Sequence, residues 1–175
     1  MYRKPSRKEI TTLNRAFNKW GVFDFFKDKS ILVKEIKTRN IREVYFLSNE
    51  IEKIALREQP SHAGLMVGEL KKNFLLSMQG ADLISKISKR FPYIIVNEAA
   101  EKSILYGKNV YSRSIISSSS TIKENEVVII LNQEKEAIAI GKTRFGENLL
   151  LQNAKIAVTT MVDAGLYLRS EGNKG

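Results

Sequence analysis

The sequence predicts an α+β protein built from two small domains. In the first half, amphipathic helices alternate with strand-like runs that pair as antiparallel hairpins. The second half opens on a strand, a capped helix, a glycine and another strand over residues 93–113, and further strand-like runs follow. The 175 residues allow one large core or two cores of roughly 80 to 90 residues each. Because Phe91-Pro92 interrupts the chain, we predict domains at 1–91 and 92–170 and a flexible tail at 171–175.

The first predicted element is a helix over about residues 7–19. Ser6 and Glu9 have the spacing of a capping box, in which each side chain satisfies a free backbone N–H at the helix start. Gly21 is expected to end this helix, and residues 22–26 to add a short second turn. Apolar residues recur at helical spacing, at Ile10, Leu13, Phe17 and Trp20.

Two antiparallel hairpins are expected in the first domain. The strand-like runs 31–36 and 44–47 flank a polar turn at residues 38–40. The apolar stretches 63–70 and 74–78 are joined by a short Lys-Lys-Asn turn. Both pairs therefore predict neighbouring strands of one antiparallel sheet.

Two more helices are predicted beside these hairpins. Asn49 and Glu52 repeat the capping spacing, and Pro60 ends the helix that they open. We expect this helix to bury three apolar side chains, Ile51, Ile54 and Ala55. A shorter helix over residues 81–88 carries Leu83, Ile84 and Ile87 on one side.

The segment 93–113 is the most informative part of the chain. Residues 93–96 are aromatic or β-branched, and Asn97 can accept hydrogen bonds from the free N–H groups of the helix after it. Glu98 lies at the positive end of the helix dipole. Gly107 supplies the left-handed residue that ends the helix. The apolar face is expected to consist of Ala100, Ile104 and Leu105.

This segment resembles the opening of a PUA domain, a small pseudo-barrel module that binds RNA. The resemblance rests on residues 96–101, 105–107 and Val110. Three later runs continue it in the right order, at 126–132, 137–142 and 163–169. We expect the Ser117–Ser120 run to form a loop tip within this domain.

Residues 44–55, the Gly64 and Gly68 pair, and residues 74–84 form a second recognisable pattern in the first half. This pattern is similar to the N-terminal domain of the Nip-seven family of ribosome-biogenesis proteins. That family joins an α/β N-terminal (pre-PUA) domain to a C-terminal PUA domain, and its closing motif has a counterpart at 163–169. The resemblance implies an N-terminal antiparallel sheet with helices, followed by a PUA β pseudo-barrel.

The resemblance also implies a function. It indicates a non-enzymatic RNA-binding factor in large-subunit assembly, with pre-rRNA or rRNA and ribosome-assembly proteins as partners. Two alternatives stay open: a protein-interaction adaptor with weak RNA affinity, and an RNA-guiding subunit of an RNA-modification enzyme.

Composition restricts the available chemistry. The chain has no cysteine and one histidine, His62, which excludes disulfides, thiolate ligands and multi-histidine metal sites. The glycines at 64 and 68 lack the lysine and hydroxyl of a phosphate loop, so we expect them to allow close backbone packing. No apolar run approaches the roughly 20 residues that cross a bilayer. We therefore predict a cytoplasmic protein with no active site, metal, cofactor or membrane partner.

The net charge of +10 indicates a polyanionic partner, and it is unevenly distributed. Residues 1–92 carry 19 Lys and Arg against 10 Asp and Glu, a net of +9. Residues 93–175 carry 10 against 9, a net of +1. The basic N-terminal half could contact phosphates or dock an acidic protein.

The PUA resemblance places seven basic residues on the expected RNA surface: Lys102, Lys108, Arg113, Lys142, Arg144, Lys155 and Arg169. Lys142 and Arg144 alternate with Gly141 and Thr143, so both should project to one side of a strand. RNA-binding members are expected to be rich in basic residues before the closing motif, whereas this chain has only Lys155 there. Three tyrosines, at 106, 111 and 167, are expected to pack in the barrel, although the first two could stack on bases.

Overall fold

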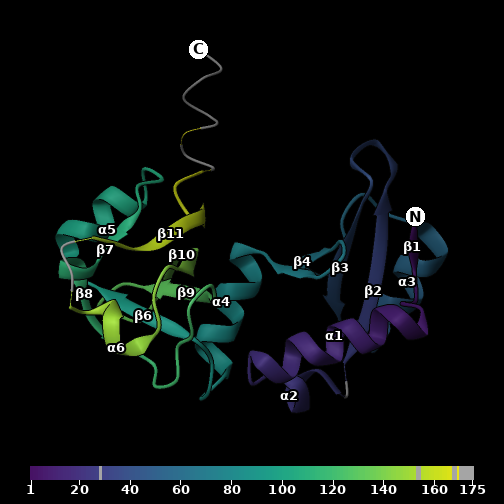
Figure 1. The fold of residues 1–175 in the computed structure, drawn as a ribbon. Coiled ribbons are helices and arrows are strands. Elements are labelled where there is room, and N and C mark those ends of the chain that lie inside the picture. Colours follow the sequence, from purple (N-terminus) through teal and green to yellow (C-terminus); the bar gives the residue numbers. More distant parts are fainter. Residues whose placement is uncertain (28, 153–154, 167–168, 170–175) are drawn as a thin grey trace. The chain divides into compact units, whose positions relative to one another are not determined.

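The computed structural model describes residues 1–27, 29–152, 155–166 and 169, and its contacts divide the chain into two compact units, Met1–Arg90 and Phe91–Gly175. Figure 1 shows the elements of each unit along the chain. The flexible tail predicted at 171–175 lies outside the described residues.

Unit 1 contains a five-stranded sheet with the order β1-β2-β3-β4-β5, in which all neighbours are antiparallel. Its strands are β1 (Tyr2–Arg3), β2 (Ser30–Ile36), β3 (Ile41–Leu47), β4 (Leu65–Leu70) and β5 (Phe74–Leu76). Its helices are α1 (Arg7–Lys19), α2 (Phe23–Lys27), α3 (Asn49–Glu58), α4 (Met78–Ile87) and the 3-10 turn η1 (Lys37–Arg39). Both predicted hairpins are confirmed, as β2–β3 and β4–β5.

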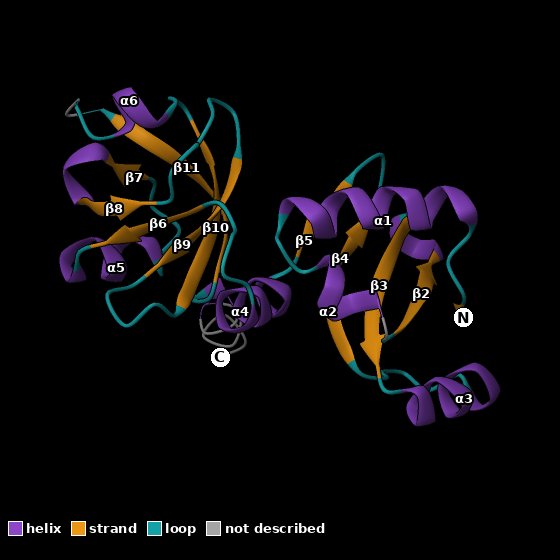
Figure 2. Cartoon of the chain, turned by 90° about the horizontal axis from the view of Figure 1, so that it is seen from below, coloured by secondary structure: helices purple, strands orange, loops and turns teal. Residues whose placement is uncertain are grey.

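Helices cover both faces of this sheet, with α1 and α3 on opposite sides (Figure 2). Successive side chains of a strand point to opposite faces, so adjacent residues join different clusters. On the α1 side, Phe26 lies between Phe17 and Phe46, with ring centres 4.4 and 4.0 Å away. On the α3 side, the buried cluster contains Tyr2, Leu32, Tyr45, Leu47, Ala55 and Ala63. Unit 1 is therefore a sheet with an apolar layer on each face.

A buried carboxylate fastens the start of α1 to the sheet. Glu9 is 5% exposed and accepts hydrogen bonds from both terminal nitrogens of Arg3 on β1, at 2.8 and 3.0 Å. Arg42 on β3 donates a third bond at 2.9 Å, and the Ser6 backbone N–H a fourth at 2.8 Å. The Arg3 hydrogen bonds lower the pKa of Glu9 to about 2. The predicted capping box is confirmed, and its glutamate also carries this tertiary contact.

The predicted inner face of α3 is confirmed for Ala55 and wrong for Ile51 and Ile54. Ile51 and Ile54 are 42% and 52% exposed, whereas Ala55 is fully buried and Leu56 packs beside it. The helix is capped by Ser48, whose hydroxyl accepts from the Ile51 N–H, so the cap lies one residue before the predicted one. Ala55 and Leu56 define the face that meets the sheet, and both isoleucines lie off that face.

Helix α4 also begins earlier than predicted. Ser77 caps it by accepting a hydrogen bond from the Gly80 N–H at 3.0 Å, which starts the helix at Met78. The close packing expected of the glycine pair is confirmed. A Cβ at Gly68 would collide with the Leu75 carbonyl oxygen, and Gly64 has a φ of +74° beside the Phe46 carbonyl.

Unit 2 contains a six-stranded sheet that curves into an almost closed barrel (Figure 2). The strand order is β7-β11-β10-β9-β6-β8, and only the β6–β9 pair is parallel. The strands are β6 (Tyr93–Val96), β7 (Val110–Tyr111), β8 (Ile115–Ser118), β9 (Val127–Leu131), β10 (Ala137–Thr143) and β11 (Ile156–Asp163). The helices are α5 (Glu98–Ile104), α6 (Glu147–Leu150) and the 3-10 turn η2 (Ser112–Ser114).

The predicted strand, helix, glycine and strand of residues 93–113 are confirmed as β6, α5 and β7. Asn97 accepts from the Ala100 N–H at 2.9 Å, and Gly107 has a φ of +77°. Ile104 is 1% exposed and anchors α5 to the barrel core, with Ala100 and Leu105 packed partly against that core. The helix is therefore held on the barrel by its apolar face and ended by the glycine.

The serine run differs from the prediction. Ser117 and Ser118 belong to β8 and pair with Ile95 and Ile94 of β6, so the expected loop tip is wrong for them. The strand ladder uses backbone N–H and C=O groups, which serine supplies as well as any other residue except proline. A polar run can therefore extend an edge strand, although its composition predicts a loop.

We expect Glu9→Gln to lower the free energy of unfolding by about 2 kcal/mol at pH 7, because it leaves Arg42 without a carboxylate and Arg3 with only the exposed Glu35. The pKa of Glu9 is lowered from 4.5 to about 2 on folding, so its ionised form stabilises the fold above pH 4.5. That contribution should disappear as the pH falls from 4.5 toward 2. Urea unfolding at pH 7 and at several pH values between 4.5 and 2 measures both effects.

The matched control is Glu50→Gln, which makes the same change at an exposed position on α3. It should leave the unfolding free energy within about 0.5 kcal/mol of the unsubstituted protein. An equal loss in both variants, or an unchanged acid transition in Glu9→Gln, would contradict the role of the buried carboxylate.

Candidate nucleic-acid interface

A hollow of about 510 Å³ opens on the surface of unit 2 beside α5, β7 and η2. Its lining includes Asn97, Ser103, Lys108, Asn109, Tyr111 and Arg113. Two cations, one aromatic ring and two carboxamides therefore meet around one recess. This combination offers charge for an anion, a flat face for a planar group and donors for its edge.

Hydrogen bonds between side chains and backbone groups join one wall of the hollow to β11. Asn109 Oδ1 accepts from the Thr160 N–H at 3.0 Å, and the Thr160 hydroxyl donates to the Lys108 carbonyl at 2.9 Å. Tyr111 lies opposite Ile156 in the β7–β11 pair. The segment from Lys108 to Tyr111 is therefore fixed against β11 before any ligand arrives.

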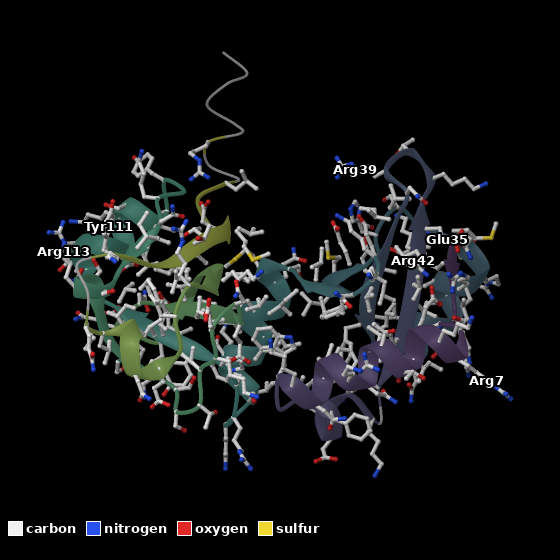
Figure 3. All side chains as sticks on the ribbon, viewed as in Figure 1. Arg7, Glu35, Arg39, Arg42, Tyr111 and Arg113 are labelled. Atoms are coloured by element: carbon white, nitrogen blue, oxygen red, sulfur yellow. The ribbon has the colours of Figure 1, made fainter. Side chains whose placement is uncertain are left out.

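The η2 turn brings a guanidinium over the Tyr111 ring. The Ser112 N–H and hydroxyl both donate to the Lys155 carbonyl, at 3.0 and 3.3 Å, which holds the start of the turn. The Cζ atom of Arg113 then lies 5.6 Å from the centre of the Tyr111 ring. Figure 3 shows these two side chains together at one edge of unit 2. A cation over an aromatic face adds favourable electrostatic energy and orients the ring.

The expectation that Tyr106 and Tyr111 pack in the barrel is wrong. Tyr106 is 72% exposed and Tyr111 is 42% exposed. The interior at this end is already filled by Ile104 and Val110, each 1% exposed, so no space remains for a larger ring. Tyr167 lies outside the described residues.

The hollow brings together the side chains of two of the seven predicted basic residues, and the backbone of a third lies beside it. Lys108 and Arg113 line the hollow, and the Lys155 backbone is bonded to the η2 turn beside it. Lys102 lies on α5 outside this lining and pairs with Glu98 at 3.5 Å across one helical turn. Because both partners are 77% exposed, water screens this pair and leaves Lys102 accessible.

Lys142 and Arg144 lie two strands away from Tyr111, with β11 between them. Both are exposed while Gly141 and Thr143 are buried, so the predicted alternation continues through the end of β10 to Arg144, the residue after it. The Arg144 Nε donates to the Thr159 hydroxyl at 3.0 Å. This pair therefore forms a second basic position on the outer face of the barrel.

Arg169 differs from the other six residues. Its two terminal nitrogens each donate to a carboxylate oxygen of Asp163 at 2.9 Å, and one also donates to the Leu105 carbonyl. Hydrogen bonding to Asp163 raises the pKa of Arg169. A Cβ at Gly165 would collide with the same Leu105 carbonyl. Three residues of the closing motif thus fasten the chain to the end of α5, and RNA contact by Arg169 stays a prediction.

The described residues contain neither a candidate metal site nor a helix that could span a membrane. Within ranges 1–27, 29–152 and 155–166 and residue 169, no group of three or more His, Cys, Asp or Glu side chains could hold a metal ion. Over the same residues, the helices are too short or too polar to cross a membrane. His62 is exposed in a loop between α3 and β4.

Two family models match the chain. The NIP7/UPF0113 pre-PUA domain matches residues 2–78, and the UPF0113 PUA domain matches residues 92–172. A UPF0113 protein from Archaeoglobus fulgidus is 30% identical over 172 residues, which are 97% of this chain and 95% of that protein.

Two solved structures share the fold over nearly the full length. A hypothetical protein from Pyrococcus horikoshii OT3 gives a TM-score of 0.70 at 16% identity, covering 98% of this chain and 99% of that one. A conserved PUA domain protein from Thermoplasma acidophilum gives 0.68 at 14% identity, covering 97% and 99%. The predicted fold, an antiparallel sheet with helices followed by a PUA pseudo-barrel, is confirmed.

Arg169→Lys separates the structural role of this residue from an RNA contact. Lysine keeps the positive charge but cannot form the two parallel bonds to Asp163, so we expect the midpoint of thermal unfolding to fall by a few degrees. We expect RNA affinity to change less than about twofold, because the charge is retained. Lys102→Arg is the control with an exposed residue, and it should alter neither quantity. A loss of RNA affinity with an unchanged unfolding midpoint would instead place Arg169 in the RNA contact.

Proposed function

The chain belongs to the NIP7/UPF0113 family, and from this premise we propose that it is a non-enzymatic RNA-binding factor in assembly of the large ribosomal subunit. Its pre-PUA and PUA domains point to RNA binding, and such domains are generally non-catalytic modules. The proposed partners are rRNA or its precursor, together with ribosome-assembly proteins.

The observation that carries the proposal is the hollow where Lys108, Tyr111 and Arg113 meet. Its volume of about 510 Å³ lies within the range of roughly 300 to 1,000 Å³ for small-molecule sites, which accommodates one nucleotide. An exposed ring can stack on a base, and nearby cations can contact its phosphate. These features favour a nucleotide that has left the base-paired stack.

The carboxamides add a means of recognising base edges. Asn109 uses its Oδ1 within the protein, in the bond from Thr160, and this leaves its amide NH2 group as a donor. Asn97 likewise uses its Oδ1 in capping α5. Both residues therefore present donors to the acceptor atoms of a base. RNA recognition usually targets single-stranded loops and ends, where such edges are free.

We expect Tyr111→Ala to weaken binding of a U-rich single strand by about tenfold, because base stacking on an aromatic ring contributes roughly 1 to 3 kcal/mol. Tyr111→Phe should retain most of the affinity, since the ring remains. Fluorescence anisotropy with labelled RNA measures the change. The control is Tyr106→Ala, which removes a more exposed ring outside the lining of the hollow. Equal effects of the two alanine variants would contradict a specific stacking role for Tyr111.

A salt titration of RNA binding tests the proposal as a whole. Affinity should fall linearly with log[salt], with a slope of about −0.7 for each phosphate contacted on a single strand. The double variant Lys142→Glu, Arg144→Glu should make this slope shallower by about 1.4 if each side chain contacts one phosphate. Filter binding at several salt concentrations measures the slope.

The charge-reversal control is Lys135→Glu, which changes an exposed residue in the turn between β9 and β10. Absence of binding to both structured and U-rich RNA would overturn the RNA-binding proposal. Loss of RNA affinity in the Lys142 and Arg144 variant, with ribosome assembly unchanged in cells, would favour the adaptor alternative. Purification of the chain with an RNA-modifying enzyme would favour the guiding-subunit alternative.

A further inference from the structure

Helix α1 presents a surface of a single charge sign. Its buried side carries Glu9, Leu13 and Phe17, and its exposed side carries six polar residues: Arg7, Lys8, Thr11, Arg15, Asn18 and Lys19. At 100° per residue these six fall within an arc of about 120°, and at 1.5 Å per residue they extend over about 18 Å. Figure 3 shows Arg7 extending away from the N-terminal end of the helix. We call these six residues the α1 basic face.

This face owes its uniform charge to the position of Glu9. The only acidic residue of α1 is turned inward and neutralised by Arg3 and Arg42. The other helices of eight or more residues mix the two signs: α3 carries Glu50, Glu52 and Glu58 beside its basic residues, and α4 pairs Lys86 with Asp82 at 2.8 Å. Within the part of the chain that the structure describes, Arg7, Lys8 and Arg15 make no ion pair.

We propose that the α1 basic face binds the phosphate backbone of double-helical RNA, as a second contact separate from the nucleotide hollow of unit 2. This inference rests on the proposed RNA-binding function and adds a substrate class to it. The chain then recognises RNA that combines a duplex segment with an unpaired nucleotide.

The composition of the face favours RNA over an acidic protein. The stable core of a protein interface is apolar and rich in aromatic residues, with charged residues depleted. The α1 basic face contains no apolar side chain. Ile10, the exposed large apolar residue of the helix, lies about 60° outside the arc. A phosphate backbone needs cations and hydrogen-bond donors, which Arg7, Lys8, Arg15 and the Asn18 amide supply.

The same composition favours a duplex over a single strand. Surfaces that hold unpaired RNA combine cations with aromatic rings on which the bases stack. The α1 basic face has no aromatic side chain, so it can contact only the backbone. Proteins recognise duplex RNA mostly through phosphate and 2′-hydroxyl contacts, because its deep major groove excludes side chains. A helix that presents cations along one exposed side fits this mode of recognition.

The test uses the full chain with Arg7, Lys8 and Arg15 all changed to Gln. Two labelled RNAs are compared, a blunt duplex of mixed sequence and a U-rich single strand. We expect duplex affinity to fall by about tenfold at low salt and the log[salt] slope to become shallower by about 2 to 3. Single-strand affinity should change by less than about twofold, because its nucleotide contact lies in unit 2.

Two further variants control for net charge and for folding. Lys37→Gln, Arg39→Gln, Lys53→Gln removes three exposed charges of unit 1 outside α1 and should have a smaller effect on duplex binding. Arg7→Lys, Lys8→Arg, Arg15→Lys keeps the charge and should bind duplex RNA like the unsubstituted protein. Thermal unfolding checks that all variants fold.

The outcomes separate this inference from the proposed function. If the unsubstituted chain binds neither RNA, both are overturned. If it binds the single strand through Tyr111 while the α1 triple variant keeps its duplex affinity, only this inference is overturned. An equal loss for both RNAs, or an equal loss in the Lys37, Arg39 and Lys53 control, overturns the assignment of the duplex to α1. If the α1 triple variant keeps its duplex affinity but no longer binds an acidic protein, that protein is the ligand of the α1 basic face, and the inference is overturned.

Discussion

In each unit, a buried carboxylate accepts hydrogen bonds from both terminal nitrogens of one arginine and so attaches a terminal segment to the rest of the unit. In unit 1, Arg3 on the first strand binds Glu9, and in unit 2, Arg169 near the C-terminus binds Asp163. Both carboxylates are 5% exposed, so neither could be tolerated there without its partner. The strand that is attached in unit 1, β1, has only two residues. In unit 2, the attached segment passes close to the Leu105 carbonyl at Gly165. In unit 1 this ion pairing adds to the packing of Tyr2, which is 2% exposed within the cluster on the α3 side.

These pairs also change how the charge of the chain should be interpreted. Residues 1–92 have a formal net charge of +9, but Arg3, Lys4, Arg42, Lys71 and Lys86 have acidic partners. The cations that remain available to a polyanion depend on where they lie. Because Glu9 points inward, the exposed side of α1 carries no acidic residue. A single buried glutamate thus fixes the helix and determines the electrostatic character of its exposed face.

Local sequence patterns predicted where helices and strands occur better than they predicted which side chains are buried. The capping box of α1, both hairpins and the unit at 93–113 follow from residues within a few positions of each other. The exposure of Ile51 and Ile54, by contrast, depends on which face of α3 meets the sheet, and helical spacing alone does not specify that face. Tyr111 is exposed because Ile104 and Val110 already fill the space beside it. The Asp163 and Arg169 pair spans six residues, but their distance depends on the bend at Gly165, which the motif did not reveal.

The two proposed RNA contacts differ in the physical source of their affinity. Attraction to phosphates is electrostatic, screened by salt and independent of sequence. Stacking on Tyr111 is less sensitive to salt, and hydrogen bonds from Asn97 and Asn109 depend on the base that is presented. Because unit 2 has a formal net charge near zero over residues 93–175, its hollow adds little long-range attraction. If both proposed contacts operate, the basic surface of the first unit attracts RNA and the hollow of the second discriminates between nucleotides, so affinity and selectivity can be altered independently.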